Sequence, residues 1–229
     1  MSNLKQNGKL RWAPSYLRNR GKVTRAQKRA LREGWDRFGI QVRHGERIDL
    51  EQVYDRTGPV LVEIGFGMGE HLLDLADSCS GSCILGIEVH RPALASVTGK
   101  LIERDWDHVR LIRGDARLVL TDHLPDSFAE AFFIQFPDPW PKAGDEHRRL
   151  VQPGMIEVME KALVEGGECQ VVTDIRSYHE HVVGCFSGLR GWSPVEHSHW
   201  NERRTLTRYE RKALHEGREI YLSNYRYDG

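Results

Sequence analysis

The sequence predicts an α/β fold built on a doubly wound, mostly parallel β-sheet with an antiparallel edge strand. Short apolar runs alternate five times with stretches of helical periodicity between residues 59 and 186. A glycine-rich turn joins the first apolar run to the first helical stretch. Parallel strands need helical crossovers, and these crossovers cover both faces of the sheet.

The first predicted element is a helix over residues 25–38, because Thr24 can cap its N-terminus. A polar stretch, 43–58, leads from this helix to the sheet. Five strands are expected, at 60–64, 83–89, 109–112, 131–136 and 169–173. The helices that follow them are expected at 70–76, 92–104, 116–120, 150–163 and 178–186, in the same order. Two last apolar runs, 192–200 and 218–226, have no helix of that length pattern between them. We expect them to form an antiparallel pair at the sheet edge.

Composition excludes several classes of protein. The chain has 229 residues, of which 39% are hydrophobic and 29% charged, enough for one domain with an arm. It shows no signal-peptide core and no run of about 18 apolar residues, so we expect a cytoplasmic protein without a membrane partner. Its four cysteines lack the paired spacing of a zinc site, and we expect reduced thiols and no metal.

Charge is distributed unevenly along the chain. Residues 1–47 hold 13 Lys and Arg against 3 Asp and Glu, whereas residues 48–189 hold 12 against 24. Trp12, Tyr16 and Trp35 lie among the cations of the first segment, beside which bases of a nucleic acid can stack. We therefore expect 1–47 to be a basic N-terminal arm that contacts RNA and 48–229 to be the catalytic domain. A solvated tail that serves only solubility is the alternative.

The glycine-rich turn after the first strand contains Gly65, Gly67 and Gly69 and follows Glu63. A dinucleotide fingerprint would need a glycine where the chain has Glu70. The pattern instead favours S-adenosylmethionine, which has no pyrophosphate and whose positive sulfonium and amino groups an acid attracts. A plain glycine turn is the alternative.

Two more carboxylates follow the next strands. Glu88 ends the second strand, where it can accept hydrogen bonds from both hydroxyls of a ribose. Asp115 follows the third strand, where it can accept from an adenine amino group or cap the helix that begins at Ala116. Because open α/β sheets bind ligands at the carboxyl ends of their strands, we expect Glu63, Glu88 and Asp115 to bind one cofactor.

The fourth strand runs into the sequence Phe-Pro-Asp-Pro-Trp, residues 136–140. Prolines on both sides of Asp138 make this loop stiff, which suits a residue that positions a substrate. Asp138 could accept hydrogen bonds from N1–H and the exocyclic amine of guanine and hold N7 against a methyl donor. N7 carries no proton, so no general base is needed. The alternatives are a turn aspartate, and for Trp140 a core anchor.

The chain resembles the bacterial tRNA (guanine-N7)-methyltransferase family, TrmB, in segments 62–69, 86–90, 114–116, 136–142, 147–152, 172–174 and 207–210, and in 15–21 of the arm. The resemblance implies a class I S-adenosylmethionine-dependent methyltransferase with a Rossmann-like sheet. It also implies methyl transfer to N7 of guanosine 46 in the tRNA variable loop, by a monomer or homodimer.

Residue roles follow from the resemblance by position. The cofactor-binding residues would be Glu63, Gly65, Gly67, Gly69, Glu88, Asp115 and Ala116, the catalytic residue Asp138, and the substrate-binding residues Lys142, Arg148, Asp174, Thr207 and Glu210. The residues alone support a structural interpretation as well as a substrate role. Asp174 can be a cap at a strand end, and Thr207 and Glu210 can form a helix capping box.

One loop departs from the family pattern. The family typically has a basic, histidine-containing loop, where this chain reads Ala-Gly-Asp-Glu-His over 143–147. Asp145 and Glu146 would repel phosphates and weaken or change the RNA target. Alternatives therefore remain: a paralogous methyltransferase for another RNA site or a small molecule, a cofactor-binding RNA protein without catalysis, and a nucleotide-dependent oxidoreductase, which Glu70 disfavours.

Overall fold

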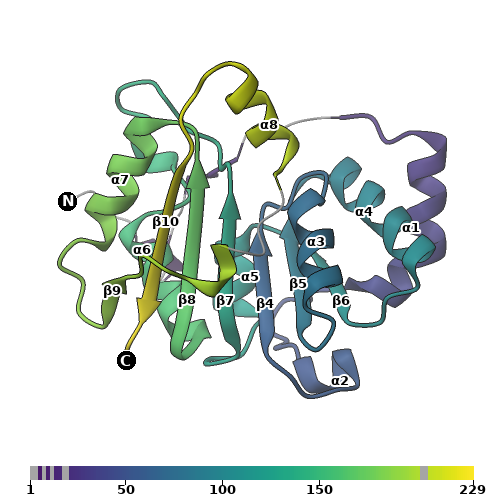
Figure 1. Ribbon diagram of the computed structural model, residues 1–229. Helices are drawn as coiled ribbons and strands as arrows, with labels where there is room; N and C mark the ends of the chain where they lie inside the picture. The colour runs from purple at the N-terminus through teal and green to yellow at the C-terminus, as the bar shows by residue number, and fades with distance from the viewer. Residues whose placement is uncertain (1–4, 7–8, 11–12, 17–20, 202–205) are drawn as a thin grey trace.

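The computed structural model describes residues 5–6, 9–10, 13–16, 21–201 and 206–229. Its main feature is an eight-stranded sheet of order β3-β6-β5-β4-β7-β8-β10-β9 (Figure 1). The strands β3 to β8 run parallel, whereas β10 is antiparallel to both of its neighbours. The strands are β3 (Gly39–Ile40), β4 (Val60–Ile64), β5 (Cys83–Glu88), β6 (Val109–Arg113), β7 (Ala129–Gln135), β8 (Leu163–Thr173), β9 (Trp192–Pro194) and β10 (Tyr221–Tyr227). The predicted doubly wound α/β fold is confirmed.

Helices cover both faces of the sheet, as Figure 1 shows. One layer holds α1 (Arg25–Phe38), α3 (Glu70–Ser78) and α4 (Arg91–Arg104), and the other holds α5 (Ala116–Asp122), α6 (Pro153–Ala162) and α7 (Arg176–Phe186). Alternate residues of a strand serve the two layers, so Val62 and Ile64 pack toward α5 and α6 while Leu61 packs toward α3 and α4. Central strands of a parallel sheet are buried on both sides, which explains why most of their residues are apolar on both faces.

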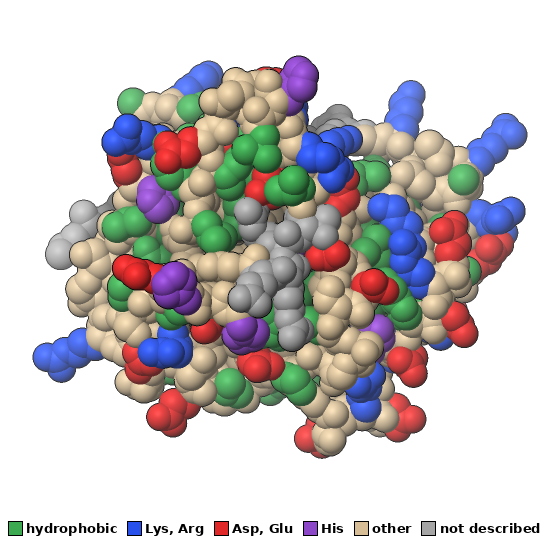
Figure 2. All heavy atoms as spheres, in the orientation of Figure 1, with side chains coloured by type: hydrophobic (Ala, Val, Ile, Leu, Met, Phe, Trp, Pro, Cys, Tyr) green, Lys and Arg blue, Asp and Glu red, His purple; other side chains and the backbone are tan. Residues whose placement is uncertain are grey.

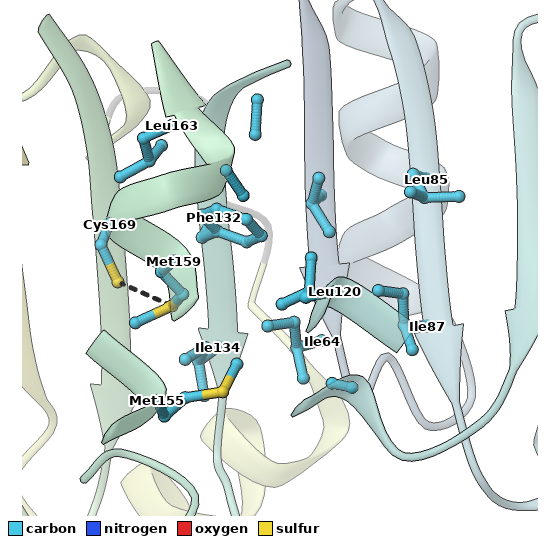
Figure 3. Close-up of a cluster of buried hydrophobic side chains, with 14 of the residues drawn as sticks. Ile64, Leu85, Ile87, Leu120, Phe132, Ile134, Met155, Met159, Leu163 and Cys169 are labelled. Carbon is cyan, nitrogen blue, oxygen red and sulfur yellow. Dashed lines mark hydrogen bonds between the residues drawn. The ribbon is translucent and has the colours of Figure 1, made fainter. Parts of the chain in front are cut away.

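The core beneath α5 and α6 is closely packed. Figure 3 shows Met155 and Met159 of α6 beside Ile134 and Phe132 of β7, and Leu120 of α5 beside Ile64 of β4. The thiol of Cys169 donates to the Met159 sulfur at 4.0 Å, and burial raises the pKa of this thiol to about 12. All four cysteines of the chain are free thiols, as expected.

The C-terminal third differs from the sequence prediction. The strand expected at 192–200 ends at Pro194, and residues 199–201 instead form a 3-10 turn that buries Trp200. A helix, α8 (Arg208–His215), lies between the two last runs, where only the capping-box alternative for Thr207 and Glu210 indicated one. Six of its eight residues are charged, histidine or tyrosine, so its apolar periodicity is hidden. The antiparallel pairing of β9 with β10 is confirmed.

Other boundaries also shift. Helix α6 begins at Pro153 rather than 150, because proline favours the first helical turn. Strand β8 begins at Leu163 rather than 169, and its glycines at 166 and 167 hide this first part in the sequence. The polar stretch 43–58 contains a five-residue helix, α2 (Leu50–Tyr54), which the sequence pattern missed. Strands β1 (Lys5–Gln6) and β2 (Lys9–Leu10) pair antiparallel in a separate small sheet.

Part of the basic segment 1–47 packs against the sheet. Phe38 at the end of α1 is fully buried, and β3 pairs in parallel with β6. Gly34 lets α1 approach α4 closely, since a Cβ there would lie 2.7 Å from Thr98 Cγ2. The predicted contact with RNA is untested, and Trp12 lies outside the described residues. Within the described part of the chain, no helix is both long and apolar enough to cross a membrane.

Candidate active site

The predicted site residues gather around a cavity of about 440 Å³ at the carboxyl ends of β4, β5, β6, β7 and β8. The chain runs from β4 through β5 to β6 on one side of β4 and then crosses to β7 and β8 on the other side, so the cavity lies at the topological switch point of the sheet. Its lining includes Glu63, Gly65, Gly67, Glu88, Ala116, Asp138, Asp174 and Thr207 from the predicted set. Gly69, Asp115, Lys142, Arg148 and Glu210 are not part of the lining.

The glycine turn after β4 has room for a ligand. Gly65 and Gly67 have φ of 73° and 52°, and a Cβ built on either would meet no atom within 4 Å. Both face the cavity. Gly69 has a different reason to be glycine, because a Cβ there would lie 2.4 Å from Val97 Cγ2 on α4. The structure therefore places Gly69 in helix packing, and its cofactor role is untested.

Glu63 and His71 form a buried pair on the cavity wall. They are 1% and 2% exposed, and the distance between His71 Nδ1 and Glu63 Oε2 is 3.0 Å. The imidazole also packs against the Phe133 ring, with centroids 5.1 Å apart. In a pair with an ionised carboxylate, which only accepts hydrogen bonds, Nδ1 is the atom that donates. Sequence reasoning missed His71, whose only signal is its place in the first turn of α3.

Glu88 ties the glycine turn to the end of β5. Its Oε2 accepts from the Gly67 amide at 3.0 Å, and its Oε1 accepts from the Val89 and His90 amides at 2.7 and 2.9 Å. These bonds fix the carboxylate at the cavity wall. Two carboxylate oxygens offer about four acceptor positions, so at least one is left for a ligand.

Asp115 acts as the N-cap of α5, which was one of its two predicted roles. Its carboxylate accepts from the Arg117 amide at 3.1 Å and lies 3.6 Å from Arg117 Nε. Burial lowers the pKa of Arg117, and the adjacent Asp115 charge opposes this shift. Gly114 and Ala116 beside it reach the cavity. Adenine recognition by Asp115 is untested.

The loop around Asp138 has a strained backbone. Phe136 and Trp140 have φ of 49° and 44°, a region that bulky residues rarely adopt. Such conformations cost about 1–3 kcal/mol each and persist only where neighbouring contacts impose them. Between these two residues, Asp138 faces the cavity.

Several contacts hold this loop in place. The Phe136 amide donates to the Val172 carbonyl at 2.8 Å, and Trp140 Nε1 donates to the Ser15 carbonyl at 3.0 Å. Arg149, which is buried, donates from Nε to the Pro139 carbonyl and from Nη1 to the Ser177 carbonyl, both at 3.2 Å. The loop is therefore fixed at both ends before any substrate binds. Trp140 is 7% exposed, which agrees with the core-anchor alternative.

Three of the five predicted substrate residues are not part of the cavity lining, and two of these, Arg148 and Lys142, come from the segment after Asp138. Arg148 stacks on the Trp140 ring, 3.4 Å from its centroid, and its Nε donates to the Pro14 carbonyl at 3.4 Å. Lys142 is exposed on the loop that follows. The stacked guanidinium supports the Asp138 loop and the N-terminal segment, and its contact with substrate is untested.

The other three predicted substrate residues belong to the rim formed by α8 and the end of β8. Asp174 lines the cavity and forms an ion pair with Arg218, a residue that sequence reasoning missed. Thr207 also lines the cavity, and its hydroxyl accepts from the Glu210 amide at 3.2 Å as the N-cap of α8. Glu210 is 1% exposed and lies behind this cap. The capping role is observed for Thr207, and the substrate roles are untested.

Helix α8 is attached to α3 across the cavity mouth. Glu70 accepts from the Arg208 amide and, at 2.8 Å, from Arg211 Nη2. Tyr209 stacks on Phe136 with ring centroids 6.3 Å apart. The residue that departs from the dinucleotide fingerprint, Glu70, thus positions the rim of the site.

One of the two acids in the loop 143–147, Glu146, has a structural role in the turn of that loop. Glu146 Oε2 accepts from the Gly144 amide at 2.8 Å. Hydrogen bonds from its own amide and from the Gly144 amide lower the pKa of the Glu146 carboxyl. This carboxylate therefore closes the turn.

Comparisons with known proteins agree with this geometry. Residues 57–223 match the model of a family described as "Putative methyltransferase". A tRNA (guanine-N(7)-)-methyltransferase of Leifsonia xyli subsp. xyli is 37% identical over 212 residues, which cover 90% of this chain and 92% of that protein. A protein of the same name from Nitrosococcus oceani is 33% identical over 207 residues, 90% of this chain and 87% of the relative.

The chain belongs to the tRNA (guanine-N7)-methyltransferase family. Among solved structures, the 16S rRNA methyltransferase KamB superposes with a TM-score of 0.60 at 16% identity, covering 84% of this chain and 98% of that one. The methyltransferase thus has the Rossmann-like class I fold. Among the described residues, no three His, Cys, Asp or Glu side chains cluster as a metal site requires.

Proposed function

We propose that this methyltransferase transfers a methyl group from S-adenosylmethionine to N7 of guanosine 46 in the variable loop of tRNA. The observation that carries the proposal is the position of Asp138. A strained, doubly anchored loop presents it to the cavity that also contains the glycine turn, Glu63 and Glu88. We further propose a monomer or homodimer that acts in the cytoplasm.

The residues of the cavity fit S-adenosylmethionine. Gly65 and Gly67 leave open space where side chains would stand, and Glu63 places a carboxylate beside it. Glu88 offers acceptor positions for ribose hydroxyls at the end of β5, as in other nucleotide-binding α/β sheets. When bound, the cofactor supplies an electrophilic methyl group. No metal is needed for this transfer.

The substrate side depends on positioning. N7 of guanine has a free electron pair and loses no proton during methylation, so the protein need not provide a base. Asp138 can accept from N1–H and the exocyclic amine of guanine, which would orient N7 toward the cofactor. Asp174 and Thr207 offer further polar groups on the same cavity, and exposed Lys142 lies nearby for a phosphate contact.

The direct test is transfer of labelled methyl from S-adenosylmethionine to unmodified tRNA, with the product mapped by cleavage specific for 7-methylguanosine. A tRNA in which another base replaces guanosine 46 is the control. Label confined to guanosine 46 is the expected result. Label at another RNA position, or only on a small acceptor, would favour the paralogous activity that Asp145 and Glu146 suggest.

Replacing Asp138 separates positioning from cofactor binding. We expect Asp138→Asn and Asp138→Ala to lower kcat by at least about a hundredfold, because positioning contributes several kcal/mol to such reactions. Calorimetric titration with S-adenosylhomocysteine should give Kd values close to wild type. Asp77→Asn, an exposed change on α3, is the matched control. Wild-type turnover in both Asp138 variants would refute the role of Asp138.

A further inference from the structure

A second cavity, of about 670 Å³, lies between α1, β3, the start of α4 and the end of β6. We call it the α1–α4 groove. Four cations line it, Lys28 and Arg32 from α1, Arg91 from α4 and Arg113 from β6, together with one acid, Asp36. This concentration of positive charge stands against a body, residues 48–189, in which acids outnumber cations two to one.

The four groove cations are available to a ligand. All four residues are exposed. Within the described part of the chain, Lys28, Arg91 and Arg113 make no ion pair, and Arg32 has only a 3.5 Å contact with its sequence neighbour Glu33. Four like charges that share one groove repel each other, so an anion that binds among them gains affinity from all four.

The groove is preformed. Arg32 follows Lys28 by one helical turn, so both lie on the same face of α1. Gln27 Nε2 donates to the Pro92 carbonyl at 3.3 Å and fixes α1 to the start of α4. Trp35 contributes a partly buried indole to the lining. An aromatic surface beside cations is the combination that binds an unpaired nucleotide chain.

The α1–α4 groove adjoins the active-site cavity at two points of the chain. Arg91 in the groove directly follows His90 in the cavity, and Arg113 in the groove directly precedes Gly114 in the cavity. A polyanion that enters the cavity with one nucleotide can therefore continue into the groove. Figure 2 shows Lys and Arg side chains projecting on the side of the molecule where Figure 1 places α1.

We propose that the α1–α4 groove binds the sugar-phosphate backbone of the RNA substrate next to the methylated guanine. This proposal rests on the proposed function, because it takes RNA to be the substrate. The groove would add phosphate contacts that carry no sequence information and that hold the RNA in register with the active site.

The experiment measures tRNA affinity between about 50 and 200 mM KCl for two double variants, Lys28→Gln/Arg32→Gln and Arg91→Gln/Arg113→Gln. Lys161→Gln/Arg190→Gln makes the same charge change on exposed residues outside the groove and is the control. Each groove variant should reduce the slope of log K against log salt by about 1.4–1.8, the value for two lost phosphate contacts. Titration with S-adenosylhomocysteine checks that the cofactor site is intact.

The outcomes separate this proposal from the proposed function. Groove variants that match the control in slope and affinity would refute the groove, even if the wild type methylates guanosine 46. A wild type that binds tRNA through the groove but transfers no methyl would refute the activity and leave the groove standing. If the wild type does not bind tRNA at all, both proposals fail.

Discussion

The buried pair of Glu63 and His71 shows how one side chain can prepare another for a ligand. Both are almost fully removed from water, where a hydrogen bond to a charged group is strong and its loss costly. The imidazole engages Oε2 of Glu63, and Oε1 is not part of this contact. We propose that Oε1 binds the positive groups of the cofactor and that His71 is a positioning residue for this binding.

Replacing His71 should weaken cofactor binding. His71→Leu removes a hydrogen bond to a charged group, worth about 1.5–3 kcal/mol, so Kd for S-adenosylhomocysteine should rise at least about tenfold. His71→Asn can place its amide nitrogen near the Nδ1 position and should change Kd by less than about threefold. Calorimetry measures both, and thermal unfolding checks folding. Equal Kd values in the two variants and wild type would exclude the positioning role.

His181 on α7 gives a pH-dependent contribution to stability. Its Nε2 donates to the Val151 carbonyl at 2.8 Å. Burial lowers the pKa of His181, the carbonyl contact opposes this shift, nearby Arg149 adds to it and Glu146 opposes it. In the unfolded chain the same imidazole takes up a proton near pH 6.5.

Below about pH 6.5 the unfolded chain therefore binds more protons than the folded protein at this position. The free energy of unfolding should be unaffected by His181 above this pH and should fall as the pH drops below it. His181→Gln keeps a donor for Val151 but cannot be protonated, so its stability should fall less over the same range. Urea unfolding at pH 7.5, 6.5 and 5.5 measures the difference. Parallel losses in variant and wild type would contradict this assignment.

At the scale of elements, the Asp138 loop depends on its neighbours. Arg149 connects this loop to α7 through the Pro139 and Ser177 carbonyls, and its guanidinium lies 5.4 Å from the centre of the Tyr178 ring. Arg149, which follows η1 (Glu146–Arg148), thus holds Pro139 between the strained residues Phe136 and Trp140 and ties it to α7. Without these contacts we expect the loop to relax toward common backbone angles and to move Asp138.

Arg149→Met tests this dependence. Two charged hydrogen bonds are lost and two part-buried carbonyls lose their donor, so we expect a loss of about 3 kcal/mol in unfolding free energy. The kcat for tRNA should fall at least about tenfold while Kd for S-adenosylhomocysteine stays close to wild type. Arg149→Lys can keep one of the bonds and should be intermediate in both stability and kcat. A destabilised variant with wild-type kcat would limit Arg149 to a structural role.

At the scale of the whole molecule, sequence patterns predicted the elements whose burial requires apolar residues. The central strands are buried on both faces and mostly apolar, so their pattern survives in the sequence. β3 and α2 are held by neighbours in space and have two and five residues, too few to show a period. α8 is mostly polar because it lies on the rim of the cavity.

The residues of the candidate site also divide into those that the sequence predicted and those that it did not. Strand ends are predictable, so Glu63, Glu88 and Asp138 were expected at one edge and lie around one cavity. Side-chain pairings between different elements are not predictable from sequence, which is why the pairs Asp174–Arg218 and Glu63–His71 were missed. The stacking of Arg148 on Trp140 was not predictable either, because a stacked guanidinium and a free one have the same sequence, and its role toward substrate stays a prediction.

The N-terminal segment shows that residues 1–47 have two structural parts. Carbonyls of three consecutive residues are held by the body: Ala13 by Arg117 at 2.7 Å, Pro14 by Arg148 and Ser15 by Trp140. Ser15 and Tyr16 line the active-site cavity. Farther along, α1 and β3 bury Phe38 and Ile40 in the core. Removing the whole segment would therefore change stability and any RNA contact together.

Two truncations separate these effects. Deleting residues 1–22 leaves the Thr24 cap and α1 intact, so the loss in unfolding free energy should stay near about 1–3 kcal/mol, from the carbonyl contacts alone. Deleting 1–47 also removes Phe38 and Ile40, whose burial is worth about 3–6 kcal/mol more, a large part of a typical stability. Urea unfolding measures both losses.

The shorter deletion removes six cations while keeping the α1–α4 groove, so its tRNA affinity should fall and its salt dependence flatten if this segment contacts RNA. Equal stability of the two truncations would mean that α1 and β3 do not belong to the folded body.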